Sequence, residues 1–387
     1  MAVIATEEAD KEQHTQRLFA PDALRGLLMA LMALDHANLF VAHKHPSAEM
    51  WAGPFPLYND TLTFLTRLVT HLCAPGFFFL MGVGMALFAV ARRRQGWSRW
   101  AITRHLLLRG ALIVALKLLL VNRAWELSPG GWGVQVYIGV LLALGAGMMI
   151  GSFALWLRPI PLVALSALLY IGLHVAAPDP NSWGQARNAL TYILLWPGGI
   201  SGANGRTLLW SCYPVLPWLG LVTFGIAFGY WLADDARRAY GWAASIGAAF
   251  LAGFLLLRYL NGFGNLRPRM GNGWIDWLNV VKYPPSLSFV LLTMGVNLLA
   301  LAALSRARGR WHASLKSLVV FGQAPWFFYT LHLFLYAALG RLLTPKGTSI
   351  PGMWPVWLLG LAILWPLCRW YGQWKHKQPA TSLARML

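Results

Sequence analysis

The sequence has little charge, and very little of that charge is negative. Charged residues make up 12% of the 387 residues, with only 13 Asp and Glu against 32 Lys and Arg. So few charges cannot cover the surfaces of two or three soluble domains. The 57% hydrophobic content and the mean hydropathy of +0.52 are instead typical of an integral membrane protein. The composition therefore excludes an ordinary soluble protein.

Cysteine is also scarce. Cys73, Cys212 and Cys368 lie in or beside apolar stretches at unrelated spacings, and an odd number cannot form a closed disulfide framework. We therefore expect neither a disulfide scaffold nor a metal site. The first 20 residues contain no long apolar run, so we do not expect a cleavable signal peptide.

Long apolar segments, in contrast, are abundant. A helix that crosses a bilayer needs about 20 apolar residues, because every backbone amide must be bonded within the segment. Ten segments qualify: 24–43, 62–91, 99–122, 133–157, 159–177, 212–233, 241–260, 284–304, 318–340 and 353–371. The sequence predicts an all-α polytopic bundle of about ten transmembrane helices. It divides the chain into a disordered cytoplasmic lead-in (1–20), a transmembrane domain (21–374) and a cytoplasmic tail (375–387).

The positive charge is distributed as expected for a membrane protein. If the N-terminus is cytoplasmic, the inner segments hold about twice as many Lys and Arg as the outer loops. This predicts that both termini are cytoplasmic, and it explains the net charge of +19 without a nucleic-acid partner. Two outer loops, 178–211 and 261–283, are long, and we expect them to handle whatever is bound outside.

The first predicted span carries Arg25, Asp35 and His36, and such ionisable residues are costly in hydrocarbon and therefore candidates for function. Arg25 and His36 are eleven residues apart, about three helical turns, so they share one helix face and lie roughly 16 Å apart along it. Such a face can hold a long, thin anionic molecule. Asp35 adjoins His36 and is a candidate to orient it. The structural alternative is that Arg25 reaches inner-leaflet phosphates while His36 bonds a neighbouring helix.

Two more histidines are predicted at a similar depth. Counting from the outer helix ends, His36, His332 and His71 lie roughly 10 to 14 Å deep. A single histidine is usually a hydrogen-bonded packing residue, but three in one layer indicate a site if their faces converge. Pro75-Gly76 follows His71 and can open the helix beside it.

Basic residues on the third span face the cytoplasmic side. Arg104 and Arg109 lie within the span itself, so they need a buried anion or acid if they point inward. Together with Arg25 they can form a phosphate pocket. The triplet that precedes them, Arg92-Arg93-Arg94, is interpreted mainly as a topology signal.

Two outer helix starts have matching chemistry. Lys282 and Tyr283 open the eighth span and Tyr213 opens the sixth, and a proline follows each tyrosine. Helix N-termini there would direct positive dipoles to an outer vestibule and suit an oxyanion or an acidic sugar. The alternative is a proline helix start with interfacial aromatic residues.

The order of several short motifs resembles a known family. The motifs are Asp22-Ala23-Leu24-Arg25-Gly26, Leu34-Asp35-His36, Pro75-Gly76-Phe77-Phe78-Phe79-Leu80-Met81-Gly82, Pro214-Val215-Leu216-Pro217-Trp218-Leu219-Gly220, Lys282-Tyr283-Pro284-Pro285-Ser286-Leu287, and Phe321-Gly322-Gln323-Ala324-Pro325 with Tyr329 and His332. Over nearly all spans, the chain is similar to bacterial members of the heparan-α-glucosaminide N-acetyltransferase catalytic-domain family. It is similar, more distantly, to integral-membrane acyltransferases that O-acetylate bacterial surface polysaccharides.

The resemblance implies transfer of an acetyl group from cytoplasmic acetyl-CoA to an acceptor on the far side of the membrane. It implies that Arg25 and His36 are the essential pair and that Arg104 and Arg109 bind CoA. In the lysosomal enzyme an amide residue matches His36, and the catalytic histidine lies in the following outer loop. The same loop here contains His43 and His45, so the choice of catalytic imidazole stays open.

We therefore expect a multi-pass enzyme of the bacterial inner membrane, with acetyl-CoA as acyl donor, no metal, and a glycan or amino sugar as acceptor. Direct attack and a two-step route through an acylated histidine both stay open, as does a homodimer. The alternatives are a transporter or channel for an anionic or sugar substrate with a histidine proton relay, and a membrane partner without chemistry. The candidate residues are catalytic His36, Asp35, His71 and His332, cofactor-binding Arg25, Arg104 and Arg109, and substrate-binding His45, Lys282, Tyr283 and Tyr213.

Overall fold

The computed structural model describes residues 18–46, 49–52, 55–58, 60–182, 187–379 and 382. Most of the lead-in predicted at 1–20 and part of the tail predicted at 375–387 lie outside these residues. The helices are α2 (Phe19–Ala37), α3 (Thr61–Thr70), α4 (Cys73–Arg94), α5 (Arg99–Leu116), α6 (Asn122–Trp125), α7 (Val140–Ala154), α8 (Pro159–Val175), α9 (Ala189–Leu194), α10 (Val215–Asp234), α11 (Ala236–Leu260), α12 (Trp274–Leu278), α13 (Leu287–Ser305), α14 (Gly309–Gln323), α15 (Pro325–Leu343) and α16 (Ile350–Lys377). The remaining elements are the π-helical η1 (Asn38–Ala42) and η2 (Lys117–Val121), the 3₁₀ turn η3 (Pro180–Ser182), and the strands β1 (Val134–Ile138), β2 (Gly198–Ser201) and β3 (Thr207–Ser211).

The predicted fold class, an all-α polytopic membrane bundle, is confirmed. Within the described residues, eight helical segments are long and apolar enough to cross a membrane. Two shorter apolar helices, α7 and α8, occupy the places of the fourth and fifth predicted spans. The cytoplasmic placement of both termini stays a prediction.

Two predicted spans differ from the structure. The segment 318–340 is not one helix, because α14 ends at Gln323 and α15 begins at Pro325. Proline has no N–H and its ring disfavours a helical residue before it, so the helix stops and restarts there. The segment 133–157 begins as strand β1, which pairs parallel to β3, and only α7 is helical.

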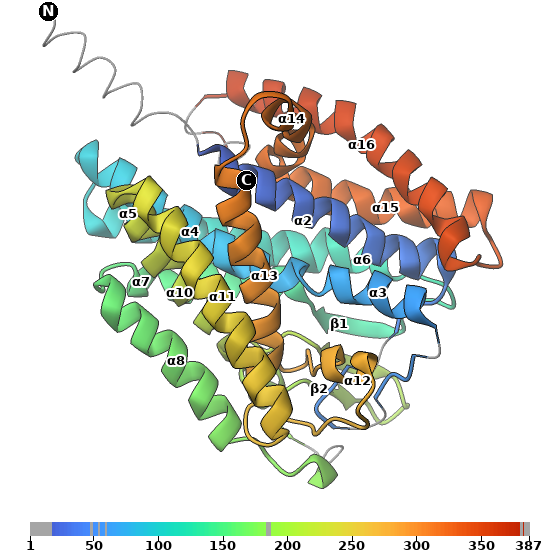
Figure 1. Cartoon of the computed structure of the whole chain (residues 1–387). Helices are drawn as coiled ribbons and strands as arrows, with labels where there is room; N and C mark the ends of the chain where they lie inside the picture. The colour runs from blue at the N-terminus through green and yellow to red at the C-terminus, as the bar shows by residue number, and fades with distance from the viewer. Residues whose placement is uncertain are drawn as a thin grey trace, which may run out of the picture.

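The helices form a bundle with α2 near its centre (Figure 1). Helix α2 contacts α4, α13, α14, α15 and α16, and further close pairs are α4 with α10, α5 with α7, and α11 with α13. The three-stranded sheet, in the order β1-β3-β2, lies with α12 at one end of the bundle. This is the end where α8 and α11 finish and where α10 and α13 begin. We call it the outer end, and the opposite end the inner end, after the topology predicted from the sequence.

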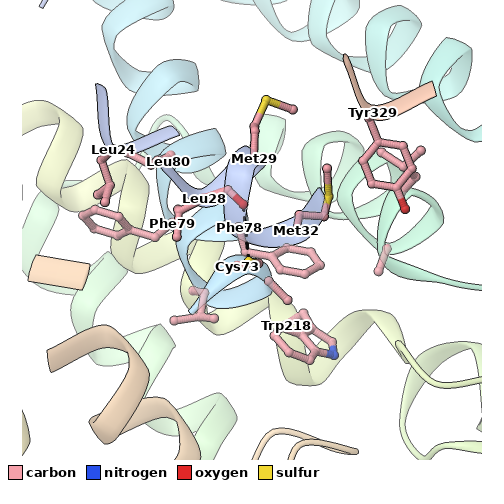
Figure 2. Packing of buried hydrophobic residues seen from close by; sticks show 14 of the residues in the cluster. Leu24, Leu28, Met29, Met32, Cys73, Phe78, Phe79, Leu80, Trp218 and Tyr329 are labelled. Carbon is pink, nitrogen blue, oxygen red and sulfur yellow. Dashed lines mark hydrogen bonds between the residues drawn. The ribbon is translucent and has the colours of Figure 1, made fainter. Parts of the chain in front are cut away.

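The packing of α2 against α4 is dense and largely apolar. Figure 2 shows Leu24 and Leu28 of α2 beside Phe79 of α4, and the Cys73 thiol donates a hydrogen bond to the Leu28 carbonyl at 3.3 Å. Trp218 of α10 stacks on an α4 ring with centroids 5.0 Å apart. Lipid tails are as apolar as these side chains, so helix association in a bilayer depends on close van der Waals contact of this kind.

Two glycines bring α14 against the start of α2. A Cβ atom at Gly26 would lie 1.8 Å from the Leu318 carbonyl oxygen, and one at Gly322 would lie 2.0 Å from the Asp22 carbonyl oxygen. Only glycine permits this approach of the two backbones. The contact fixes the first two turns of α2, which include Arg25, against the C-terminal part of α14.

Candidate active site

A cavity of about 410 Å³ runs along the inside of the bundle. Its wall is largely apolar and comes from α2, α4, α5, α7 and α15, with further residues from the end of α14 and from α16. The lining includes side chains from the inner helix ends, among them Arg25, and from the opposite ends of α4 and α7, where Phe77 and Leu141 lie. The cavity therefore extends over much of the bundle length rather than forming a shallow surface cleft.

Cationic side chains line the inner end of this cavity: Arg25, Arg109, Lys375 and the titratable His376. Arg25 donates from Nη1 to an Asp22 carboxylate oxygen at 2.8 Å and to the Gly322 carbonyl at 3.1 Å. The Arg109 Nε is buried and, among the described residues, has no hydrogen-bond partner. Such an orphaned donor on a cavity wall suits an anionic ligand, because its desolvation is otherwise uncompensated.

Arg104 does not join this group, contrary to expectation. Its side chain is exposed and it does not line the cavity, whereas Arg109 is half-buried and does. The reason is helical geometry: five residues correspond to a rotation of about 500°, so the two side chains point about 140° apart. The structure instead brings Lys375 and His376 of α16 to the cavity, and their positions in a predicted tail had concealed this.

His36 and His332 form a buried pair near the other end of α2. The His36 Nδ1 lies 2.6 Å from the His332 Nε2, and the His332 Nδ1 lies 2.9 Å from the Phe328 carbonyl oxygen. A carbonyl can only accept, so the His332 Nδ1 carries a proton and the neutral ring accepts at Nε2. The His36 Nδ1 is then the donor. This leaves the His36 Nε2 with a free lone pair, and it has no hydrogen-bond partner within the described part of the chain.

Tyr329 connects this pair to the cavity. It lines the cavity, and its ring packs edge-on against His332 with centroids 5.4 Å apart. Tyr329 and His332 are three residues apart on α15, so they share one face of that helix. The passage from the cationic end therefore leads to within one helical turn of the histidine pair.

Asp35 does not contact His36. Its carboxylate accepts hydrogen bonds from Arg67 at 2.5 Å and from Thr70 at 2.9 Å, and it lies 3.3 Å from the His45 Nε2. Adjacent helical residues point about 100° apart, which separates the two side chains. The expectation that Asp35 orients His36 is therefore wrong, and the group that orients His36 is His332.

His71 belongs to the Asp35 side rather than to the histidine pair. Its Nε2 lies 2.8 Å from a carboxylate oxygen of Glu49, whose two oxygens are also bound by Arg67. Glu49, Arg67 and His71 are all at most 2% exposed. Burial opposes ionisation of Glu49, but Arg67 and then His71 outweigh it, and they hold the pKa of the carboxyl well below its usual range.

Glu49 was missed by sequence reasoning. It lies in a loop without periodicity, and the available signal was its rarity as one of 13 acidic residues in the chain. It carries a second function through its backbone, because its carbonyl oxygen accepts hydrogen bonds from the N–H groups of Lys282 and Tyr283 at 3.2 and 3.1 Å. The segment that contains Lys282 is thereby fixed beside the Glu49–Arg67 pair.

Of the four residues predicted to bind substrate, Lys282, Tyr283 and Tyr213 lie together, and His45 instead contacts Asp35 and Arg67. Lys282 is 4% exposed, and its ammonium lies 5.2 Å from the centroid of the Tyr283 ring. The Tyr283 hydroxyl donates to the Tyr213 hydroxyl at 3.4 Å. Burial, and then Arg67, lower the pKa of Lys282.

An aromatic residue, Trp125, lies beside His36 in addition to His332. The edge of Trp125 meets His36 with centroids 5.5 Å apart, and Tyr137 packs against Trp125 at 5.4 Å. The ammonium of the fully buried Lys117 lies 4.9 Å from the Tyr137 ring centroid and donates to Asn122. Within the described residues, no three His, Cys, Asp or Glu side chains are placed to share a metal ion.

Comparison with known sequences identifies the family. Residues 17–260 match the family described as heparan-alpha-glucosaminide N-acetyltransferase, catalytic. The chain belongs to this family. It is also similar to the mouse (Mus musculus) protein named heparan-alpha-glucosaminide N-acetyltransferase, with 25% identity over 189 residues, which is 48% of this chain and 26% of the mouse protein. The match thus covers about a quarter of the length of that relative.

Family membership, together with the apolar helices, makes the protein a multi-pass member of a membrane acetyltransferase family. The matched range contains Arg25, His36, Glu49 and Arg109. His332 lies beyond residue 260, yet the structure places it against His36.

Proposed function

We propose that this protein transfers an acetyl group from acetyl-CoA, bound at the cytoplasmic side, to an amine or hydroxyl of a glycan-like acceptor on the outer side of the membrane. The observation that carries the proposal is the cavity that runs from the cationic inner helix ends to Tyr329, whose ring packs against His332 of the His36–His332 pair. Membership of the acetyltransferase family supports the reaction class.

The cavity suits the two chemically different parts of acetyl-CoA. Phosphate groups pair well with guanidinium and ammonium side chains, and Arg25, Arg109 and Lys375 provide them at the inner end. The pantetheine arm is slender and needs a long passage with few charges. Met29, Leu80 and similar side chains form such a wall. The nucleotide therefore stays at the inner surface, while the thioester reaches Tyr329 and His36.

His36 acts at its Nε2 atom. In the direct route this lone pair accepts the proton of the acceptor amine or hydroxyl while the acceptor attacks the thioester carbonyl. The new C–N or C–O bond forms as the C–S bond breaks, and the CoA thiolate takes up the proton. In the two-step route Nε2 itself attacks the thioester carbonyl, and the C–S bond breaks to release the CoA thiolate. The acceptor then attacks the acetyl group, the bond from Nε2 to the acetyl carbon breaks, and the thiolate takes up the acceptor proton. His332 serves both routes by fixing the proton of His36 on Nδ1.

In this proposal the acceptor approaches from the outer side, towards Asp35. Asp35 contacts His45 and Arg67 there, and Lys282, Tyr283 and Tyr213 lie at the outer helix starts. Asp35 keeps 16% of its side chain exposed, whereas Glu49 keeps none. Asp35 is thus the carboxylate that can reach an acceptor amine or hydroxyl.

The proposal is tested with purified protein in lipid nanodiscs, acetyl-CoA labelled in the acetyl group, and glucosamine as a first acceptor. We expect acetyl transfer by the wild type, loss of transfer in His36→Ala, and a raised KM for acetyl-CoA in Arg109→Met. Near wild-type transfer by a folded His36→Ala variant would refute the assignment of the base.

The competing class, a transporter, is tested with the same protein in sealed vesicles. We expect acetyl transfer when the acceptor is on the side of the vesicle membrane that the outer end of the protein faces and acetyl-CoA is on the other side. Uphill movement of a sugar or anion in the absence of acetyl-CoA would favour transport and contradict the proposal.

A further inference from the structure

A second cavity, of about 330 Å³, opens at the outer end of the bundle. It lies between the end of α8, the end of α11 and the loop that follows α11, which finish at the same edge in Figure 1. Its lining includes Trp51, Asp179, Asn261, Phe263, Leu266 and Arg267. None of these residues belongs to the histidine pair, to the Asp35–Arg67–Glu49 group or to the inner cavity.

The loop that borders this cavity is held in a costly conformation. Asn261 and Leu266 have φ angles of 53° and 58°, and Gly264 between them has a φ of 89°. Glycine and asparagine tolerate the left-handed region, but leucine rarely adopts it. Backbone strain of this kind persists only where the surroundings enforce it, and it is concentrated at functional sites.

A buried arginine enforces the loop shape. Arg258, 1% exposed, donates to the Asn265 side chain at 2.9 Å and to the backbone carbonyls of Trp277, Asp276 and Asn279. Asn265 in turn donates to the carbonyls of Leu257 and Gly262. One guanidinium therefore ties the end of α11, the loop and α12 together.

The opposite wall is fixed as well. The Trp51 indole N–H donates to the Pro178 carbonyl at 3.2 Å. His174 uses both ring nitrogens: Nδ1 bonds the Tyr170 carbonyl at 2.8 Å, and Nε2 accepts from the Leu287 N–H at 3.1 Å. Because its walls are pinned on each side, this cavity is preformed.

The lining chemistry favours a sugar. Phe263 leaves 56% of its surface exposed and offers an aromatic face, while Arg267 and Asp179 provide charged hydrogen-bonding groups at the rim. A volume of this size, with an aromatic platform and a few polar groups, suits one or two sugar rings.

The outer cavity lies close to the Asp35–Arg67–Glu49 group. Trp51 lies two residues after Glu49, and the Trp51 N–H donates to the Tyr283 carbonyl at 2.9 Å. Two residues of extended chain span at most about 7 Å. The two sites are therefore neighbours on one short segment.

We infer that this outer cavity binds a sugar ring of the acceptor glycan, adjacent to the ring that carries the acetylated group. The inference rests on the proposed function and extends it, because it predicts that the protein prefers an oligosaccharide acceptor to a monosaccharide. Phe263 stacks on the distal ring, and Arg267 bonds its polar substituents.

The test compares glucosamine with a heparan-derived tetrasaccharide that ends in an α-glucosaminide. Phe263→Ala and Arg267→Ala should each raise the KM for the tetrasaccharide about tenfold or more, while the KM for glucosamine and for acetyl-CoA stays at the wild-type value. Phe263→Tyr, which keeps the ring, and Arg269→Ala should behave as the wild type. Arg269 lies on the same loop but faces Trp277 instead of lining the cavity.

Equal KM values for the tetrasaccharide in the wild type and in Phe263→Ala would overturn the inference, even if both proteins acetylate glucosamine. If the wild type acetylates neither probe, the proposed function fails separately. In that case the subsite is decided by direct binding: weaker tetrasaccharide binding by Arg267→Ala than by Arg269→Ala supports it, and equal or absent binding refutes it.

Discussion

Replacement of His332 tests how the structure prepares His36 for chemistry. His332 is fully buried and bonded on both ring nitrogens, to the Phe328 carbonyl and to the His36 Nδ1. In His332→Phe the ring volume is kept but the acceptor for the His36 Nδ1–H is lost. His36 can then carry its proton on Nε2, which removes the lone pair that acts as base.

The expected sizes of the two consequences differ widely. Leaving one buried donor without a partner costs about 1–3 kcal/mol of stability. Loss of a correctly oriented general base lowers a rate by about 10²–10⁴-fold. We therefore expect His332→Phe to remain folded in nanodiscs, to show an unchanged KM for acetyl-CoA, and to lose at least two orders of magnitude in kcat.

His332→Gln is the matched control, since its side-chain carbonyl can accept the same hydrogen bond. It should retain more activity than His332→Phe, with acetyl transfer measured by scintillation counting and folding measured by thermal unfolding. If His332→Phe retains wild-type kcat while His36→Ala is inactive, His332 does not orient His36 and this reasoning is refuted.

Three further predictions concern the rest of the site. Arg109→Met should raise the KM for acetyl-CoA about tenfold or more, whereas Arg104→Met should not, because only Arg109 lines the cavity; equal effects in steady-state kinetics would contradict this. Glu49→Gln should lower the free energy of unfolding by about 1.5–3 kcal/mol, because the buried Arg67 loses one of its two carboxylate partners and keeps Asp35. Since the pKa of Glu49 is depressed on folding, its contribution is present above the unfolded pKa of about 4.3 and is lost only as the pH falls further. The Tm of Glu49→Gln should therefore fall less than that of the wild type on acidification, and parallel Tm curves would argue against the pair. Gly322→Val should weaken acetyl-CoA binding and lower the Tm, because its Cβ would lie 2.0 Å from a carbonyl oxygen of α2; a wild-type KM would show that the contact does not position the cavity.

Much of the bundle could be predicted from the sequence, because a membrane span is recognisable as a run of about 20 apolar residues. Residues 99–122, for example, match the helical segment Arg99–Trp125, since an apolar run of this length has no stable alternative in lipid. Prediction failed where the secondary structure of a segment depends on a partner that is distant in the sequence. The apolar segment at 134–138 becomes a strand because β3, seventy residues later, provides its partner.

In the candidate site, too, local features could be predicted from the sequence and tertiary contacts could not. Depth along a helix is local, so the common level of His36 and His332 was predictable, and the structure pairs them. Rotation about each helix depends on tertiary packing, which depth alone does not reveal. His71 therefore lies at the predicted level but turns to Glu49, and the sequence offered no periodic signal for Glu49 itself.

The most direct test of the account is a cryo-EM map of the protein with a non-hydrolysable acetyl-CoA analogue. We predict density along the cavity, with phosphates against Arg25 and Arg109 and the acetyl carbon beyond Tyr329, within about 4 Å of the His36 Nε2. Density that leaves this cavity empty, or an acetyl carbon separated from His36 by packed side chains, would contradict the claim that one donor joins the two ends of α2.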